Sequence, residues 1–454
     1  MADRGTAKEI RFNALEQGNP SFQSFGLWAH PRDRAVDYTK LSYWTEYAQL
    51  LERGLFDNLF LADVYGFPDV FRGNADGALR NGSQAPSLDP SVLLAGMAGA
   101  TSNLCFTMTG SATYERPYSF ARRLSTLDHM ADGRIGWNIV TSYLESGARA
   151  MGLDGLIPHD RRYDMADEFL EGVYRLWEQS WGEGALVKDK ETRVYADPSK
   201  IERIDLEGEF HRFHAIHATE PSPQRTPLLF QAGGSSRGRL FAATHAEGIY
   251  LNGTTIEIVR DKIATMTKEL EAVGRSRDSV KFFAGVSVFV DETDELARAT
   301  YDDYLRWSSL EGLLSTMSGI MGIDLSQYPL DEPIVYAEND ANRSAMEMFT
   351  RNNAWTLRQV LEEKALCGTN MALVGSPTHV ADELIRWMDE TDLDGFNIAR
   401  IVAHETYEKF IDLVVPILQE RGRYKTEYAP GTFREKLFGI SRIPETHTAG
   451  TYRR

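Results

Sequence analysis

The sequence predicts an α/β protein, a (β/α)8 TIM barrel with long insertions at its C-terminal face. Eight short apolar segments recur along the 454-residue chain, and segments with helical spacing separate them. Regular alternation of strands and helices favours a parallel sheet, and eight repeats favour a closed barrel over an open doubly wound sheet. Ligands bind such barrels where the strands end, so we expect the functional residues to follow the strands.

The predicted strands are short, apolar and bounded by turn residues. They span residues 10–15, 59–62, 104–108, 135–140, 228–231, 248–251, 280–290 and 395–401. The predicted helices lie at 44–55, 90–100, 118–130, 163–178, 236–244, 256–273 and 407–421, and another begins after Ser376.

Three stretches fall outside this alternation. Residues 67–90 form a long irregular segment, and residues 182–223 an excursion of turns and short strands. Residues 291–366 are largely helical with no strand signal. We treat the chain as one domain over residues 1–454, with a mainly helical insertion at about 291–366.

Composition limits the compartment and the partners. Hydrophobic residues make up 42% of the chain, which is ample for a large core, and the net charge of -17 argues against nucleic-acid or anionic-membrane partners. Cys105 and Cys367 are too few for a disulfide framework or a zinc cluster. The first residues lack the apolar core of a signal peptide, and no run is long and apolar enough to span a bilayer. We expect a cytoplasmic protein.

Polar side chains follow several predicted strands. Asp63 ends a very apolar strand, so it either ligates something or caps the next turn. Thr109 follows the third strand and Asn138 lies in the fourth, within one βαβ unit. His30 has a similar position after the first strand. These residues are candidates for the site.

A Gly/Ser-rich loop follows the fifth strand. Residues 230–239 read Phe-Gln-Ala-Gly-Gly-Ser-Ser-Arg-Gly-Arg and open a helix. Glycines allow close approach of backbone N–H groups, and the helix start adds unpaired donors and a positive dipole end. Ser235 and Ser236 add hydroxyls, and Arg237 or Arg239 adds charge. The loop suits a phosphate, although a plain serine cap is the alternative; it is not a Walker A loop.

The same loop fits a second pattern. Residues 234–238 match the nucleophile elbow of α/β-hydrolases, with Ser236 as the nucleophile. Asp394 and His404 follow in the required order. Against this esterase alternative, no oxyanion-type His-Gly-Gly run precedes the serine, and the elbow follows the fifth strand of a barrel-like alternation.

His159 and Tyr163 begin the helix after the fourth strand. Their spacing of four residues places both on one helix face, from which either can bind a phosphate or a ring. The alternative is a capping segment with a packed tyrosine.

Together these segments resemble a known family, the reduced-flavin-dependent monooxygenases of the bacterial luciferase type. The branch is that of the nitrilotriacetate, dibenzothiophene-sulfone and dimethyl-sulfide monooxygenases. The matching segments keep their order and are residues 51–57, 59–63, 121–128, 133–142, 159–163, 166–170, 221–227 and 231–233, with Ser235.

The resemblance implies a TIM barrel with FMN at its C-terminal face. The positions that contact FMN in relatives are held here by Asp63, Thr109, His159, Tyr163 and Ser235. Asn138 is expected beside the isoalloxazine ring, and we take it as a catalytic candidate together with His30, which is expected to handle protons over the substrate.

The resemblance also implies a two-component reaction. A separate NAD(P)H:flavin reductase supplies FMNH2, which reacts with O2 to a flavin C4a-(hydro)peroxide. The oxygen goes to a small organosulfur or amine/aminopolycarboxylate compound, with C–S or C–N cleavage. Residues 67–90 and 291–366 are candidate lids that keep water out. Relatives form dimers or tetramers, so we expect a homodimer or homotetramer.

Overall fold

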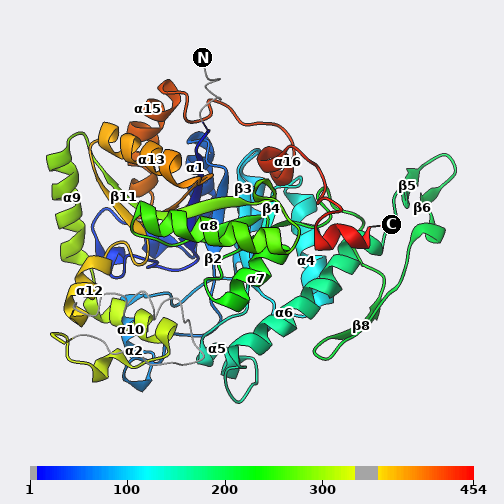
Figure 1. Ribbon diagram of the computed structural model, residues 1–454, viewed down its shortest axis with the longest axis horizontal. Helices are drawn as coiled ribbons and strands as arrows, with labels where there is room; N and C mark the ends of the chain where they lie inside the picture. The colour runs from blue at the N-terminus through cyan, green and yellow to red at the C-terminus, as the bar shows by residue number, and fades with distance from the viewer. Residues whose placement is uncertain (1–7, 333–355, 454) are drawn as a thin grey trace.

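Eight parallel strands close into a barrel, which confirms the predicted fold (Figure 1). The computed structural model describes residues 8–332 and 356–453. In order around the barrel the strands are β1 (Arg11–Gln17), β2 (Asn58–Ala62), β3 (Cys105–Ser111), β4 (Ile135–Val140), β9 (Leu228–Gln231), β10 (Gly248–Leu251), β11 (Lys281–Val290) and β13 (Gly395–Ala399). The pairing of β13 with β1 closes the ring.

A ninth strand, β12 (Met371–Gly375), lies outside this ring and was not predicted. The first half of β11 pairs with β13 as far as Val286, and the second half pairs with β12 from Val286 to Val290. Because β11 is ten residues long, it runs past the end of the ring and offers β12 an edge.

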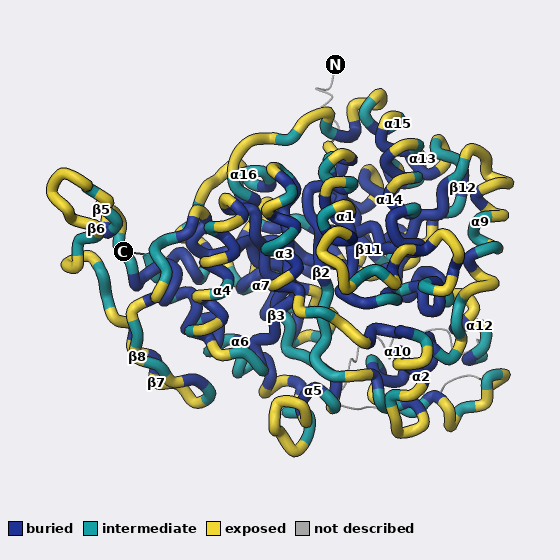
Figure 2. Tube along the Cα trace, turned by 180° about the vertical axis from the view of Figure 1, so that it is seen from behind, coloured by how far each residue is buried: buried dark blue, intermediate teal, exposed yellow. Residues whose placement is uncertain are grey.

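Helices surround the barrel on all sides. They are α1 (Leu41–Arg53), α3 (Pro90–Gly99), α4 (Pro117–Met130), α6 (His159–Tyr174), α7 (Ser236–His245), α8 (Ile256–Ala272), α13 (Pro377–Thr391), α14 (Glu405–Lys409) and α15 (Val415–Glu420). Alternate strand residues such as Phe12 and Trp137 point outward and pack with Trp44, Phe120 and other helix residues. The buried centre of the molecule is this layer and the barrel (Figure 2).

The C-terminal ends of the strands carry added helices. They are α2 (Asp76–Asn81), α5 (Glu145–Ala150), α9 (Asp294–Trp307), α10 (Leu310–Met321) and α12 (Leu357–Lys364), and α2, α10 and α12 lie at the lower left of Figure 1. Helices therefore dominate the described part of the predicted insertion. Residues 333–355 lie outside the described residues, and the boundaries of the insertion and the single-domain assignment stay predictions.

Two antiparallel hairpins form the excursion between β4 and β9. They pair β5 (Leu186–Asp189) with β6 (Val194–Ala196), and β7 (Ile204–Glu207) with β8 (Arg212–Ala215). The first hairpin projects to one side of the body in both views (Figures 1 and 2). The prediction of short strands here is confirmed.

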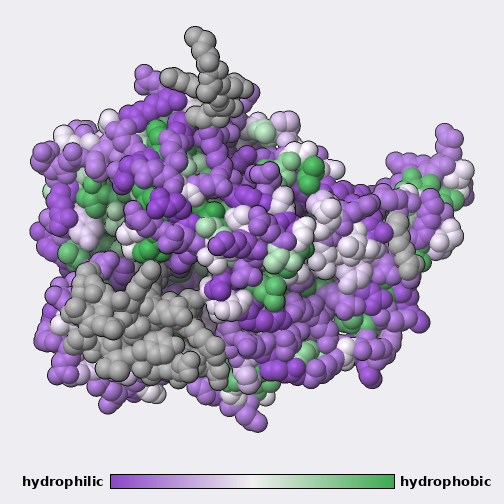
Figure 3. Space-filling view, viewed as in Figure 1, coloured by the Kyte–Doolittle hydropathy of each residue, from purple (hydrophilic) through white to green (hydrophobic). Residues whose placement is uncertain are grey.

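Helix α16 (Phe433–Phe438) closes the barrel at the N-terminal ends of the strands. Phe433 and Leu437 join the interior cluster, in which Leu15, Phe230 and Phe283 fill the barrel. The face seen in Figure 3 is mainly polar, with apolar residues in small separate groups. Within the described residues, the helices are all too short or too polar to cross a membrane.

Candidate active site

Two helix N-termini meet beside β4 and β9. Helix α6 starts at His159, and Ser235 caps α7 by accepting from the Gly238 N–H at 3.1 Å. The Asp160 carboxylate accepts from Nδ1 of His159 at 2.7 Å, so Nε2 accepts from the Ser235 hydroxyl at 3.3 Å. The positive ends of both helices therefore point to one place, which suits an anion.

Two glycines allow this close approach. A Cβ on Gly238 would lie 2.7 Å from the hydroxyl of Tyr163, and a Cβ on Gly233 would lie 2.5 Å from Nε2 of Gln231. The Gln231 side chain accepts from the Gly233 N–H at 2.6 Å and fixes the loop. Tyr163 thus presents its hydroxyl at the start of α7, where any larger residue than glycine would displace it.

The arginines of this loop have other partners. Arg237 forms ion pairs with Asp167 and, at 3.4 Å, with Asp164, and it lies over the ring of Tyr163. Arg239 donates to the Gly234 carbonyl at 2.8 Å and to the hydroxyl of Ser236 at 3.4 Å. An anion here is therefore met mainly by helix dipoles, hydroxyls and the imidazole, because the carboxylates already neutralise Arg237.

Thr109 and Asn138 form a polar pair inside the barrel. They are partners in the register of β3 and β4, and Asn138 Nδ2 donates to Thr109 Oγ1 at 3.0 Å. Both are buried, at 5% and 4% exposed, and Oδ1 of Asn138 has no hydrogen-bond partner among the described residues. A buried acceptor without a partner is costly, so this pair is suited to a ligand with a hydrogen-bond donor. We call Thr109 and Asn138 the polar wall.

Asp63 follows directly after β2. Burial raises the pKa of this carboxyl from 3.8 to about 7, and the negative charge of Asp89 adds to the rise. The carboxyl is therefore close to half protonated at neutral pH, and it can donate or accept a hydrogen bond.

These residues occupy one continuous arc of the barrel. Strands β2, β3, β4 and β9 are neighbours, and their ends carry Asp63, Thr109, Asn138 and Ser235. The arc fits FMN, because the glycine-lined helix starts suit its phosphate and the polar wall suits its ring. The chain thus brings together His159, Tyr163 and Ser235, which lie 76 residues apart between first and last. We call these three residues and the two helix starts the phosphate cradle. Ser236 is the exposed first residue of α7, next to this cradle.

His30 lies apart from the arc, in the segment between β1 and α1. The Arg32 N–H donates to its Nδ1 at 3.2 Å, so its Nε2–H donates to Asp303 on α9 at 3.1 Å. Its ring also packs against Tyr304 and Trp307. These contacts join the first loop to α9, and a role in proton handling stays a prediction.

The α/β-hydrolase alternative is wrong. The closed parallel barrel is a different fold, and the three residues of the supposed triad are not assembled. Ser236 follows the C-terminal end of β9, whereas Asp394 precedes β13 at the opposite end of the barrel and pairs with Arg277 at 2.8 Å. His404 packs instead against Tyr43 on α1.

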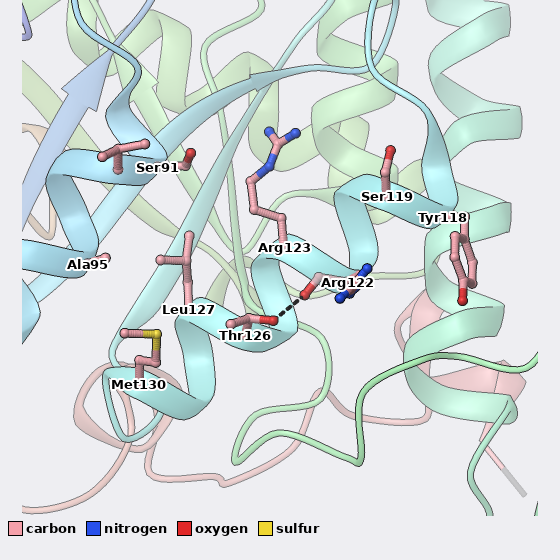
Figure 4. Close-up of a pocket in the computed structure, with 10 residues that line it drawn as sticks. Ser91, Ala95, Tyr118, Ser119, Arg122, Arg123, Thr126, Leu127 and Met130 are labelled. Atoms are coloured by element: carbon pink, nitrogen blue, oxygen red, sulfur yellow. Dashed lines mark hydrogen bonds between the residues drawn. The ribbon is translucent and has the colours of Figure 1, made fainter.

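A groove lies on the outside of the barrel, between α3 and α4 (Figure 4). Its volume is about 510 Å³, and Ala95, Arg122 and Met130 are among its lining residues. Of the two adjacent arginines, Arg123 pairs with Glu115 at 2.8 Å. The groove is lined by helix residues and lies away from the strand ends, so we separate it from the candidate site.

Sequence reasoning missed two residues at the strand ends. Gln231 shapes the cradle, and Gln17 ends β1. The same signal points to both glutamines, a polar residue at the end of a mainly apolar strand. It singles out Asp63 and Thr109 in the sequence analysis, where the two glutamines were not considered.

Comparisons with known proteins agree on one family. The model of the family described as luciferase-like monooxygenase matches residues 22–393. The chain is 45% identical to the dimethyl-sulfide monooxygenase of Hyphomicrobium sulfonivorans, over 98% of this chain and 94% of that protein. The crystal structure of that enzyme, covering 98% and 96% of the two chains, gives a TM-score of 0.92 at 44% identity.

Two further relatives are nearly as similar. The long-chain alkane monooxygenase of Geobacillus thermodenitrificans is 43% identical over 98% of both chains. The crystal structure of a riboflavin lyase with modified FMN and riboflavin gives a TM-score of 0.93 at 36% identity. The match covers 98% of this chain and 100% of that chain.

Proposed function

The chain belongs to the luciferase-like monooxygenase family and is a flavin-dependent monooxygenase, and on this basis we propose a two-component reaction. A separate NAD(P)H:flavin reductase delivers FMNH2, and one oxygen atom of O2 goes to a small organosulfur or amine/aminopolycarboxylate compound. Cleavage of a C–S or C–N bond follows. The observation that carries the proposal is the convergence of the α6 and α7 N-termini on His159 and Ser235.

In this proposal the cradle holds the phosphate of FMN. The hydroxyls of Ser235, Ser236 and Tyr163 would donate to phosphate oxygens, with the Ser235 hydroxyl turning there from Nε2 of His159, which lies beside them. Backbone N–H groups at the two helix starts supply further donors. Arg237 pairs with Asp164 and Asp167, and Arg239 lies 3.7 Å from Glu269, so both arginines of this loop already face carboxylates of the protein.

The wall holds the flavin ring. Asn138 would hold the ring through its Oδ1, which has no partner among the described residues, while Thr109 fixes the amide by accepting from its Nδ2. Asp63 lines the edge of the ring, with a carboxyl that carries a proton for part of the time at neutral pH. Reduced FMN, when bound, supplies the electrons with which O2 is activated.

Water exclusion falls to residues 67–90 and to the helices of the segment 291–366. Helix α2 packs on α10 through an ion pair of Arg80 with Glu311 at 3.0 Å, and Ser309 donates to Asn81 at 2.6 Å. Phe71 packs with Leu313 and other residues of an apolar cluster between the two segments. The two candidate lids therefore act as one unit, which excludes water from the reduced cofactor.

The contacts of the arginines favour an organosulfur substrate over an aminopolycarboxylate. Arg32 pairs with Glu405 at 2.7 Å and Arg34 with Glu46 at 2.8 Å. These two arginines thus pair with carboxylates of the protein, whereas a polyanionic substrate needs free positive charge.

The remaining parts of the proposal concern assembly and compartment. We place the protein in the cytoplasm, as a homodimer or homotetramer, with a reductase that acts transiently or by diffusion of FMNH2. Its two cysteines are free and buried, as suits a reducing compartment.

One assay tests the function. The protein is supplied with FMN, NADH and a flavin reductase, and O2 use and products are followed for a dialkyl sulfide, a sulfone and nitrilotriacetate. We expect substrate-dependent O2 use and a C–S cleavage product with one of the sulfur compounds. Catalase added in parallel reports uncoupled peroxide. If all the O2 consumed ends as peroxide with every compound, the proposed substrate classes are wrong. Cleavage of nitrilotriacetate, without cleavage of the sulfur compounds, would reverse the preference for an organosulfur substrate.

A further inference from the structure

Gln17 ends β1, on the side of the barrel opposite the phosphate cradle. Three strands separate β1 from β9 in either direction around the ring. A flavin that is held at β9 and lies along the arc of β4, β3 and β2 therefore leaves the mouth near β1 for another molecule. A substrate that approached the far edge of such a ring would therefore lie beside the end of β1.

The side chain of Gln17 points into the barrel. Strand residues alternate between the two faces of the sheet. Asn13 bonds Asn397 at 2.8 Å inside the barrel, and Leu15 belongs to the interior cluster. Gln17 is the next residue of this series, and its register partner is Ala62, directly before Asp63.

The amide of Gln17 is buried and unsatisfied. The residue is 1% exposed, and neither Oε1 nor Nε2 has a hydrogen-bond partner in the described parts of the chain. Asn19, two residues on, is also 1% exposed with both side-chain polar atoms unpartnered. Buried amides nearly always find partners, so the polar atoms of this pair are available to a bound molecule.

The backbone that carries these amides is fixed from the other side. Glu16 accepts from the Gln17 N–H at 2.8 Å and pairs with Arg400 at 2.6 Å. Arg400 also donates to the carbonyls of Asn19 at 3.2 Å and Pro20 at 3.1 Å. The amides are therefore presented rigidly, which favours specific binding. Because Glu16 neutralises Arg400, this part of the mouth suits a neutral polar group.

We propose that Gln17 is a specificity-determining residue whose amide donates to a neutral oxygen on the substrate. The substrate class is then an oxygenated organosulfur compound, such as a sulfoxide or sulfone, in preference to a bare sulfide or hydrocarbon. Asn19 provides a second donor at the same mouth. The inference rests on the proposed function, because it assigns the substrate of that site.

The test compares methyl phenyl sulfone with methyl phenyl sulfide, which differ in the two oxygens. Dissociation constants are measured by tryptophan fluorescence on the full-length protein with FMN bound. The wild-type protein binds the sulfone about five- to tenfold more tightly than the sulfide, as expected for one or two net hydrogen bonds. Gln17→Met, which keeps the volume and removes the amide, abolishes that preference.

Two further measurements separate this role from a structural one. Gln17→Met does not lower the melting temperature, because it replaces an unsatisfied polar group by an apolar one. Leu15→Met, a volume-conserving change in the same strand, retains the preference for the sulfone. Turnover with the reductase is followed in parallel, and binding preference without substrate-dependent O2 use would refute the proposed function while supporting this assignment.

Three results would overturn the assignment. They are equal affinity of the wild-type protein for sulfone and sulfide, an unchanged preference in Gln17→Met, and weaker FMN binding in Gln17→Met with the preference intact. The last result would make Gln17 a cofactor contact instead.

Discussion

The two ends of the barrel differ in how their buried polar side chains are satisfied. At the N-terminal ends of the strands, charged side chains are paired and hydrogen-bonded. At the C-terminal ends, Glu16 and Arg400 form a buried pair, but several buried amides have no hydrogen-bond partner among the described residues. Both ends belong to the same eight strands, so the difference reflects separate roles in stability and in ligand binding.

Arg434 is the centre of the N-terminal end. It is fully buried on α16 and donates to both carboxylate oxygens of Glu247, at 2.7 and 2.8 Å. It also donates to the carbonyls of Thr226 at 3.0 Å and Pro227 at 3.1 Å. These residues precede β9 and β10, so one guanidinium ties the closing helix to two strands.

The C-terminal end leaves comparable groups unsatisfied. Oδ1 of Asn138 and both amide atoms of Gln17 have no partner within the described ranges, and burial raises the pKa of Asp63 to about 7. Unsatisfied buried groups lower stability. Stability is therefore concentrated at one end and binding capacity at the other, as in other TIM barrels.

The largest expected effect is on stability, from Arg434→Met. It leaves the Glu247 carboxylate buried without its cation, which costs about 3–5 kcal/mol. Urea unfolding measures the loss, and FMN affinity of the folded protein stays unchanged because the cradle lies at the other end.

A double variant serves as the control. Removing both charges in Arg434→Met with Glu247→Leu should recover part of the lost stability, since replacement of a whole buried pair by apolar residues is often neutral. A destabilisation equal to or greater than that of Arg434→Met would show that the hydrogen bonds to Thr226 and Pro227 matter more than the charge.

The second effect contrasts two helix caps. Ser235→Ala removes the cap of α7 at the C-terminal end, and Thr432→Ala removes the cap of α16 at the N-terminal end. Each should cost about 1 kcal/mol of stability. FMN affinity should fall by about 1–2 kcal/mol in Ser235→Ala alone, through a lost charge-assisted hydrogen bond.

Fluorescence titration of FMN decides between the two roles of Ser235. Equal FMN affinity in both cap variants would mean that Ser235 is a structural cap with no part in the phosphate site.

Sequence patterns found what is local, and missed what depends on distant partners. The apolar strands and the Gly/Ser loop before Ser235 are each readable within about ten residues. Strand β12 was missed because it depends on the overhang of β11. Likewise the partner of His30 is Asp303, 273 residues on, and the partner of Arg434 is 187 residues away. The inward direction of Gln17 required the closed barrel itself.

The third effect depends on pH and concerns Asp63. Its pKa in the folded protein, about 7, lies above its value of 3.8 in the unfolded chain. The folded state therefore binds this proton more tightly, and the carboxyl destabilises the fold progressively as the pH rises from about 4 to 7. Asp63→Asn should add about 1 kcal/mol at pH 8, a value reduced by solvent screening, and nothing below pH 4. Melting curves between pH 5 and 8.5 measure the difference, and a gain that does not vary with pH would contradict the raised pKa.

The smallest effect on affinity is expected from Thr109→Ala. It tests whether the phosphate cradle and the polar wall have separate roles at the C-terminal end. The change removes the hydroxyl that accepts from Asn138, so the Asn138 amide loses its fixed orientation while the phosphate cradle is untouched. FMN affinity should therefore change by less than about 0.5 kcal/mol, but the peroxide released per O2 consumed should rise, because the ring is held less firmly. Thr109→Ser keeps the hydroxyl and should behave like the wild-type protein. If Thr109→Ala weakens FMN binding as much as Ser235→Ala does, the wall also anchors FMN, and the cradle and the wall do not have separate roles.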